Sequence, residues 1–399
     1  MLVQFSIRNV LSFKDEVVLD MTAIPSYKEH EDNLIDLGLK DKYLRVAAIY
    51  GANASGKSNL VAAMRYFQDI ILSSNNRIKD GEAGVLEQLY RPYSFTDKRE
   101  TSEYQIVVAD NEFEYRYGFE FDDEEIVTEW LYRVKLSTMR QSVILERSRL
   151  GIEFGASVRR ELNKFKDKIS KETLVLSFFS NMENMKVDDF NRVYDLIVDT
   201  LVVSSEFAEN NNVIYNLLPR VIDEEKAKLV SFLNAIDVGI IDIDYDDTEK
   251  EIKFTTYHIG QDGKEHSLSL FRESEGTIKS IVLYIYARFA VMTNRSMFVD
   301  ELNSKLHPLL LKFIIDLFYE QNSRAQLLYT THDTTLMDKK FFRRDQIWFV
   351  QKNDYGCSEL ASLSDFKVRS DASFEKDYLA GVYGGIPQLK ELGLIKDGE

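Results

Sequence analysis

The sequence predicts an α/β fold in which a mixed sheet core and an antiparallel β lobe carry an inserted helical lobe. A glycine-rich loop follows the apolar run Val46–Tyr50 and precedes an amphipathic helical pattern, which is the strand–loop–helix order of a phosphate-binding loop. Strand-like runs separated by polar turns come next, and a helical periodicity then replaces them. We therefore expect an N-terminal lobe over 1–158, a helical insertion over 159–235 and a C-terminal lobe over 236–399.

Length and composition describe a globular chain. Its 399 residues are 44% hydrophobic and include a single cysteine, Cys357. This content suffices for a large core, and one cysteine excludes an internal disulfide and any multi-cysteine zinc site. No apolar run approaches the ~20 residues needed to span a bilayer, and the first residues alternate like a strand instead of forming a signal peptide. We expect a cytoplasmic protein with no membrane partner.

The charge distribution bears on nucleic-acid binding. A formal net charge of −16 argues against a broadly basic surface that coats nucleic acid, but it leaves room for a local patch or for a groove formed between subunits. Basic residues outnumber acids between Arg133 and Lys171. For this segment we favour a solvated helix face over a contact with nucleic acid or a partner protein.

The N-terminal part reads as strands on either side of the glycine-rich loop. Leu2–Ile7 alternates between apolar and polar residues, and Val17–Met21 is a second, short candidate. After the helix that follows the loop, three runs rich in β-branched and aromatic residues are joined by short polar turns, which predicts an antiparallel meander. These runs are 104–108, 113–121 and 126–136.

The second half of the chain changes from helical to mixed periodicity. From about 159 to 228 the apolar residues recur at the spacing of buried helix faces. Strands are expected again at 240–245 and 251–257, around an acidic turn. The dipeptide Asp262-Gly263 then predicts a hairpin.

The glycine-rich loop Gly51–Ser58 carries the strongest functional signal, because it matches G-x-x-x-x-G-K-[ST] at every specified position. Its glycines let backbone N–H groups face phosphate oxygens, Lys57 reaches the β- and γ-phosphates, and the Ser58 hydroxyl ligates Mg²⁺. A glycine-rich turn with an unrelated lysine would not need the flanking strand and helix. The candidate nucleotide-binding residues here are Gly51, Asn53, Ala54, Ser55, Gly56, Lys57, Ser58 and Asn59.

A second apolar run, Met297–Glu301, ends in two acids. Asp300 would join the Mg²⁺ shell and Glu301 would polarise the attacking water. An ordinary strand end on the surface fits the same pattern, but the phosphate-binding loop makes the catalytic interpretation the better one. About 240 residues separate the two motifs, which is too many for a compact GTPase-like or kinase-like core, so a large insertion must divide the site.

Two further motifs complete the candidate site. Ser274 and Gly276 precede a helical pattern, where they form either an anion-binding cup or an ordinary N-cap, and both interpretations stay open. His332 ends a buried run one helix after the acids, and we favour a contact with the γ-phosphate over a purely structural role. The candidate catalytic residues are thus Glu301, His332 and Lys57, and the candidate metal ligands are Ser58 and Asp300.

The order of these motifs resembles the ATP-binding-cassette (ABC) head of soluble SMC-like and chromosome-repair ATPases. More narrowly, the chain resembles the bacterial AAA/ABC-like ATPase subunits of abortive-infection and restriction-linked defence systems, which include RloA-like, Septu-type and overcoming-lysogenization-defect ATPases. The resemblance covers the whole chain and implies an ABC-type P-loop ATPase head. The segments that carry the narrower resemblance are Phe5–Phe13, Glu273–Thr277, Val299–Leu302, Leu306–Pro308, Thr330–Asp333, Arg344–Val350 and Tyr378–Pro387.

This resemblance implies cofactors and partners. Two heads of such proteins sandwich ATP and Mg²⁺, so Ser274 and Gly276 of one subunit would close on the γ-phosphate held by Lys57 of the other, in a homodimer or higher homo-oligomer. ATP-dependent dimerisation would gate a separately encoded effector, often a nuclease, in antiviral defence, and the resemblance leaves open whether ATP binding or hydrolysis is the signal. The stretch after His332 is too short for the Toprim nuclease of overcoming-lysogenization-defect proteins, so we expect the effector on another chain.

Some positions depart from the family pattern or stay open. Asn303 stands where many relatives have aspartate, and Val382 replaces a common basic residue, which puts the contacts made there in doubt. The glutamine that couples Mg²⁺ to the lobes is either Gln68 or Gln88. A DNA repair or maintenance ATPase of the SMC-like kind, binding DNA directly, is the alternative function. The interval between the half-sites lacks the sustained heptads of such proteins, and this favours the defence function.

Overall fold

The computed structural model places most of the chain. None of the helices among the residues it describes is long and apolar enough to cross a membrane. Leu306, His307 and Pro387, which belong to two of the segments with family resemblance, lie outside these residues. The described residues are 1–38, 40–75, 84–180, 182, 187–204, 211–235, 239–248, 250–303, 308–369 and 372–386.

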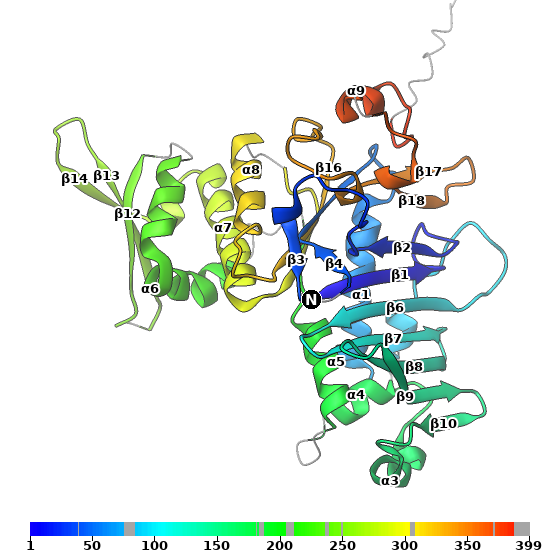
Figure 1. Ribbon diagram of the computed structural model, residues 1–399. Helices are drawn as coiled ribbons and strands as arrows, with labels where there is room; N and C mark the ends of the chain where they lie inside the picture. The colour runs from blue at the N-terminus through cyan, green and yellow to red at the C-terminus, as the bar shows by residue number, and fades with distance from the viewer. Residues whose placement is uncertain are drawn as a thin grey trace, which may run out of the picture.

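A mixed sheet forms the centre of the molecule (Figure 1). Its central strand β5 pairs in parallel with β16 on one side and β17 on the other, and only the edge strand β18 runs antiparallel to its neighbour. The carboxyl ends of the parallel strands therefore share one edge of the sheet, where ligands bind in α/β folds. The strands in spatial order are β11 (Leu201–Val203), β15 (Ser296–Val299), β16 (Gln326–Thr331), β5 (Val46–Tyr50), β17 (Ile347–Lys352) and β18 (Ser358–Ser362).

An antiparallel sheet packs beside it and includes the predicted meander, which is confirmed for β6, β7 and β8. Helix α1 (Lys57–Ser73) contacts both sheets: its Phe67 ring stacks on Phe119 of the antiparallel sheet, and its Arg65 side chain donates to the carbonyl oxygen of Val202 in the mixed sheet. Phe5 of the antiparallel sheet also contacts Phe298 of the mixed sheet directly. The strands in spatial order are β10 (Gly151–Phe154), β9 (Arg140–Ser148), β8 (Ile126–Lys135), β7 (Phe113–Phe121), β6 (Ser102–Ala109), β1 (Leu2–Arg8) and β2 (Val17–Asp20).

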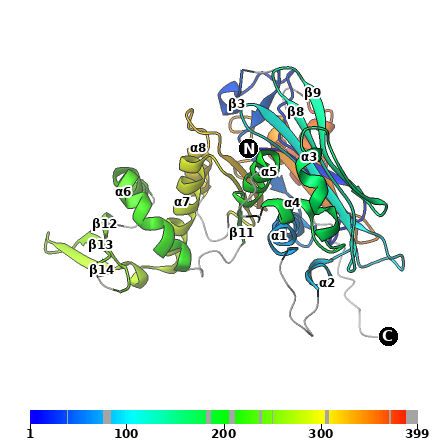
Figure 2. The ribbon, with the colours of Figure 1, turned by 90° about the horizontal axis from the view of Figure 1, so that it is seen from below.

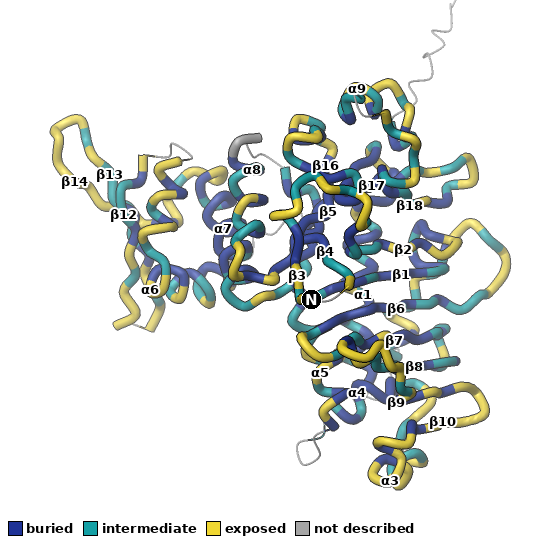
Figure 3. The backbone as a smooth tube through the Cα atoms, viewed as in Figure 1, coloured by how far each residue is buried: buried dark blue, intermediate teal, exposed yellow. Residues whose placement is uncertain are grey.

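The two faces of the mixed sheet belong to different cores. Successive side chains of a strand point to opposite faces. In β5, Ala47 and Ile49 join the core that contains α1 and the antiparallel sheet. Val46, Ala48 and Tyr50 join the core built by the helices on the other face. Figure 3 shows both cores as dark blue tube around the mixed sheet. Those helices are α6 (Asn211–Ala235), α7 (Glu275–Thr293), α8 (Pro308–Leu317) and α9 (Phe374–Leu379).

A small antiparallel sheet and α6 stand away from the two large sheets (Figures 1 and 2). The predicted hairpin at Asp262-Gly263 joins β13 to β14, and Gly263 has φ of +71°, as a tight turn requires. The strands of this sheet are β12 (Ile240–Asp246), β13 (Lys253–Ile259) and β14 (Glu265–Ser269). A separate short pair consists of β3 (Leu34–Asp36) and β4 (Lys42–Leu44).

The helical periodicity after residue 159 produces helices that go to two different places. The apolar residues of α4 and α5 join the core that contains the antiparallel sheet, whereas those of α6 join the core that contains α7. Between them, β11 joins the mixed sheet. This strand has three residues, which are too few to show a strand period in the sequence. The lobe boundaries at 158 and 235 stay a prediction. The remaining helices are α2 (Val85–Leu89), α3 (Arg159–Leu162), α4 (Val175–Ser180) and α5 (Asp188–Val198).

The basic segment is only partly helical, and the expectation of a helix face is wrong for its first half. Residues 140–154 form the hairpin of β9 and β10, and the adjacent Ile144 and Leu145 are both buried, so β9 shows no regular alternation that would indicate a strand. Arg147 is buried and donates to the carbonyl oxygens of Ser170, Lys171 and Thr173. This arginine therefore holds the structure together and is not available to a partner.

Candidate nucleotide-binding site

The phosphate-binding loop lies at the carboxyl end of β5 and leads into α1. Gly56 precedes α1 with φ of +113°. A Cβ atom at this position would lie 2.3 Å from the Ser358 Oγ atom and 2.8 Å from the Ser12 Oγ atom. A Cβ atom at Gly51 would lie 2.4 Å from the Val350 carbonyl oxygen. Both positions therefore require glycine, one for its backbone conformation and both for lack of space.

The rest of the loop surrounds a buried cation. The Lys57 Nζ atom donates to the carbonyl oxygens of Gly51 and Ala52, at 2.7 and 2.9 Å. Burial lowers the pKa of Lys57, and the nearby Glu301 and Asp300 oppose this shift. Within the part of the chain that is described, the buried Ser55 hydroxyl has no hydrogen-bond partner. A phosphate fits such a loop, since it supplies acceptors for both the ammonium group and an unpaired hydroxyl.

The exposed side of the loop holds the remaining predicted residues. Asn53 and Ala54 form its exposed tip, and Ala54 has φ of +62°. The Asn59 Nδ2 atom donates to the Ser12 Oγ atom at 2.8 Å. The Ser358 Oγ atom lies 2.7 Å from the Ser12 Oγ atom and 2.6 Å from the carbonyl oxygen of Ser55. Ser12 lies in the turn between β1 and β2, and Ser358 is the first residue of β18, so two distant segments support the loop.

The predicted metal ligands come together although 242 residues separate them. The Ser58 Oγ atom donates to the Asp300 Oδ1 atom at 3.1 Å, because the parallel strands β5 and β15 end at the same edge of the sheet. No group of three histidine, cysteine or acidic side chains that could hold a metal occurs among the described residues. Mg²⁺ at a nucleotide needs only one or two protein oxygens, because phosphates and water supply the rest. Ser58 and Asp300 therefore fit Mg²⁺.

Thr330, which the sequence analysis did not single out, fixes both acids. Its Oγ1 atom donates to the Asp300 Oδ1 atom at 2.7 Å and accepts a hydrogen bond from the Glu301 backbone N–H at 2.8 Å. Glu301 has φ of +50°, a left-handed conformation that costs a non-glycine residue about 1–3 kcal/mol and is typical of functional sites. The signals for Thr330 in the sequence were its hydroxyl near the end of a buried run and its place in the segment Thr330–Asp333, which carries the family resemblance.

His332 lies at the same edge and is exposed. The Asn303 Nδ2 atom is 3.4 Å from the His332 Nε2 atom, and the Thr331 Oγ1 atom donates to the Asn303 Oδ1 atom at 2.8 Å. Asn303 therefore connects the turn after Glu301 with the end of β16. The structure thus brings Lys57, Ser58, Asp300, Glu301 and His332 to one edge of the mixed sheet.

Ser274 and Gly276 lie elsewhere, at the start of α7. The Ser274 Oγ atom accepts a hydrogen bond from the Thr277 backbone N–H at 3.1 Å, which is N-cap geometry. Both residues are exposed, and a Cβ atom at Gly276 would have only the Ser274 Oγ atom, at 3.9 Å, within 4 Å. It is the opposite end of α7 that leads to β15 and the sheet (Figure 1). Among the described residues, no hydrogen bond joins this pair to the phosphate-binding loop.

A cavity of about 660 Å³ adjoins the loop at Ser12 and Asn59. Its wall also contains aromatic and basic side chains, among them Tyr90, Arg91 and Phe95. Its volume lies within the range of small-molecule sites.

Gln68 was one of two candidates for the glutamine that couples Mg²⁺ to the lobes. Its buried amide donates to the carbonyl oxygens of Ile197 and Thr200 and so holds α1 against the end of α5. This pairing counts against Gln68 in that role.

Comparison with known proteins places the chain in a family. Residues 46–338 match the family described as "AAA domain, putative AbiEii toxin, Type IV TA system". The chain belongs to this family of AAA domains. The matched residues of this AAA domain include the phosphate-binding loop, Asp300, Glu301 and His332. The predicted AAA-type ATPase is thereby confirmed at the level of the family.

Comparisons of this chain with curated proteins and with solved structures give weaker likenesses. No curated protein matches the chain. An SMC head bound to the C-terminal winged-helix domain of ScpA is 15% identical, with 94% of this chain and 99% of that chain covered and a TM-score of 0.43. The SMC head domain from Thermotoga maritima is 14% identical, with 92% and 99% covered and a TM-score of 0.41. The α/β fold class with its mixed and antiparallel sheets is confirmed by the topology itself.

Proposed function

We propose that this AAA domain binds ATP with Mg²⁺ and hydrolyses it to ADP and phosphate. The observation that carries the proposal is the hydrogen bond between Ser58 of the loop and Asp300 at the end of β15, with Glu301 and His332 beside them. Lys57 would leave the two loop carbonyls and bind the β- and γ-phosphates. Mg²⁺ held by Ser58 and Asp300 would neutralise charge on the phosphate oxygens.

Glu301 is the proposed general base. A water molecule would attack the γ-phosphorus while the Glu301 carboxylate accepts its proton, and the bond between the γ-phosphorus and the bridging oxygen of ADP would break. His332 would donate a hydrogen bond to the γ-phosphate. Thr330 would keep Glu301 in its left-handed conformation through the hydrogen bond to its N–H.

Hydrolysis in this proposal takes place between two copies of the chain. Ser274 and Gly276 are exposed and have space around them, so they are accessible to the γ-phosphate of a second subunit. The N-terminus of α7 would present N–H groups to that phosphate. The same residues also serve as an N-cap, and a serine that accepts from Thr277 can do both.

The biological role that we propose is that of a cytoplasmic regulatory subunit in anti-phage defence, which gates a separately encoded effector, a nuclease, through ATP-dependent dimerisation. Membership in the family described as "AAA domain, putative AbiEii toxin, Type IV TA system" supports this role. Direct DNA binding, as in SMC-like repair ATPases, is the second candidate. It is favoured by the exposed Lys164 and Lys168 in the 3₁₀ helix Asn163–Lys168.

The decisive experiment separates the loop from the Ser274–Gly276 cup. Lys57→Ala should abolish ATP binding, whereas Gly276→Asp should leave binding intact and block hydrolysis in the opposing subunit, because it adds bulk and a repelling charge. Mixing the two variants should restore about one functional site per heterodimer. If heterodimers form and stay as inactive as either variant, hydrolysis at a shared interface is wrong or requires both sites together.

A second variant tests the base itself. Glu301→Gln should bind ATP, hydrolyse it about 10²–10⁴-fold more slowly and accumulate as a dimer. Glu251→Gln, the same change at an exposed position before β13, should release phosphate at the wild-type rate. Undiminished phosphate release by Glu301→Gln would refute the assignment of the base, and light scattering would report the dimer.

A further inference from the structure

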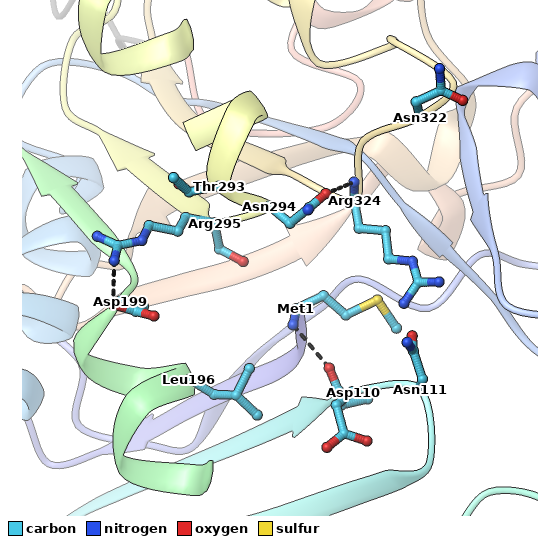
Figure 4. Close-up of a pocket in the computed structure, with 12 residues that line it drawn as sticks. Met1, Asp110, Asn111, Leu196, Asp199, Thr293, Asn294, Arg295, Asn322 and Arg324 are labelled. Atoms are coloured by element: carbon cyan, nitrogen blue, oxygen red, sulfur yellow. Dashed lines mark hydrogen bonds and ion pairs between the residues drawn. The ribbon is translucent and has the colours of Figure 1, made fainter. Parts of the chain in front are cut away.

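A cavity of about 510 Å³ opens at the end of the mixed sheet opposite to the phosphate-binding loop. It lies where the turn after β6, the end of α5, the end of α7 and the segment before β16 meet (Figure 4). Its volume is within the range of small-molecule sites. Its wall includes Asp110, Asn111, Asp199, Asn294, Arg295 and Arg324.

The charges around this cavity do not cancel. Asp199 forms an ion pair with Arg295, at 2.6 Å. Asp110 forms one with Arg192, which lies outside the wall, at 3.2 Å. Arg324 has no acidic partner within 4.0 Å among the residues the structure describes, and Figure 4 shows its guanidinium group extending toward Asn111. Because both carboxylates are already paired, Arg324 is left without an acidic partner among the described residues. The Met1 amino terminus also lines the cavity, but burial lowers its pKa to about 6, so Arg324 is the lasting positive charge at neutral pH.

The wall also offers neutral hydrogen-bond donors. The Asn294 Oδ1 atom accepts from the Arg324 backbone N–H at 2.7 Å, which leaves the Nδ2 hydrogens of Asn294 as donors. Asn111 and Asn322 also line the cavity, and Figure 4 shows the Asn111 side chain beside the Arg324 guanidinium group and the Asn322 amide directed away from it. A phosphate group has more acceptor oxygens than a carboxylate, so a guanidinium group with an amide beside it suits phosphate better.

We propose that this cavity binds the phosphate group of a small organic molecule and that Arg324 is its principal ligand. The site is separate from the ATP site, because it lies at the amino ends of β15 and β16 while Asp300 and Thr330 lie at or near their carboxyl ends. The four residues of β15 span about 13 Å. The proposal stands or falls independently of ATP hydrolysis.

Titration calorimetry of the full-length Lys57→Ala protein with inorganic pyrophosphate tests this proposal, since that background removes the lysine of the phosphate-binding loop. We expect saturable binding that Arg324→Gln weakens by about 10–100-fold, the value of a charge-assisted hydrogen bond. The matched control is Arg140→Gln, which removes the same charge at an exposed position on β9 and should bind as the Lys57→Ala parent does.

Two further measurements define the site. Asn111→Asp, which places a negative charge in the wall, should also weaken pyrophosphate binding, and the unfolding temperatures of all variants should match that of the parent because the altered side chains are exposed. Citrate should bind more weakly than pyrophosphate. Absence of saturable pyrophosphate binding, equal binding by Arg324→Gln, or tighter binding of citrate would each overturn the proposal.

Discussion

Replacing Gly56 by alanine tests how the phosphate-binding loop is built. The glycine has φ of +113°, and a Cβ atom there would lie 2.3 Å from the Ser358 Oγ atom, 2.9 Å from the Ser358 Cβ atom and 2.8 Å from the Ser12 Oγ atom. Separations below 3.0 Å force something to move. Ser358 is itself held by hydrogen-bond contacts with Ser12 and Ser55, so it cannot yield without losing them.

The magnitude follows from two costs. A non-glycine residue in such a backbone conformation costs about 1–3 kcal/mol. Overpacking a filled site adds about 1–3 kcal/mol. We therefore expect Gly56→Ala to lower the free energy of unfolding by about 2–6 kcal/mol and to displace the loop enough to weaken ATP binding.

Gly263→Ala separates the two costs. Gly263 also has a positive φ, of +71°, but a Cβ atom there would meet nothing within 4 Å. Urea denaturation should show that Gly263→Ala costs only the backbone strain. Adding Ser358→Gly to Gly56→Ala should recover part of the crowding cost, because it removes the two Ser358 atoms. The reasoning fails if Gly56→Ala is no more destabilising than Gly263→Ala.

Two further predictions concern buried hydrogen bonds. Thr330→Val preserves the shape of the side chain but removes the hydroxyl between Asp300 and the Glu301 N–H. It should therefore lower the free energy of unfolding by about 1–3 kcal/mol and slow phosphate release more than it weakens ATP binding. Phosphate release at the wild-type rate would contradict the positioning role. Burial raises the pKa of Glu129 above its ordinary 4.5, although Arg147, two backbone N–H groups and Tyr117 oppose this. Because the folded-state pKa is raised, the contribution of Glu129 to stability is largest below pH 4.5 and diminishes as the pH rises. The free energy of unfolding of the wild type relative to Glu129→Gln should therefore fall from below pH 4.5 toward neutral pH. Urea titrations in which this difference rises with pH would refute the sign.

Local patterns in the sequence predicted much of the architecture. The alternation in Leu2–Ile7, the meander, and the hairpin at Asp262-Gly263 all depend on neighbouring residues, and the structure confirms them. The same patterns failed at β11, which is three residues long, and at 140–154, where burial does not alternate regularly along β9. Short or heavily charged strands give too few alternations to fix a period.

The sequence by itself determined that a phosphate-binding loop follows a strand and precedes a helix, because the glycines and their φ angles are local requirements. Only the tertiary structure decided that Asp300 meets Ser58, that Thr330 fixes both acids, and that Ser358 fills the space beside Gly56. These contacts depend on which parallel strands become neighbours in the mixed sheet. That order is set by packing between residues hundreds of positions apart, which no local pattern records.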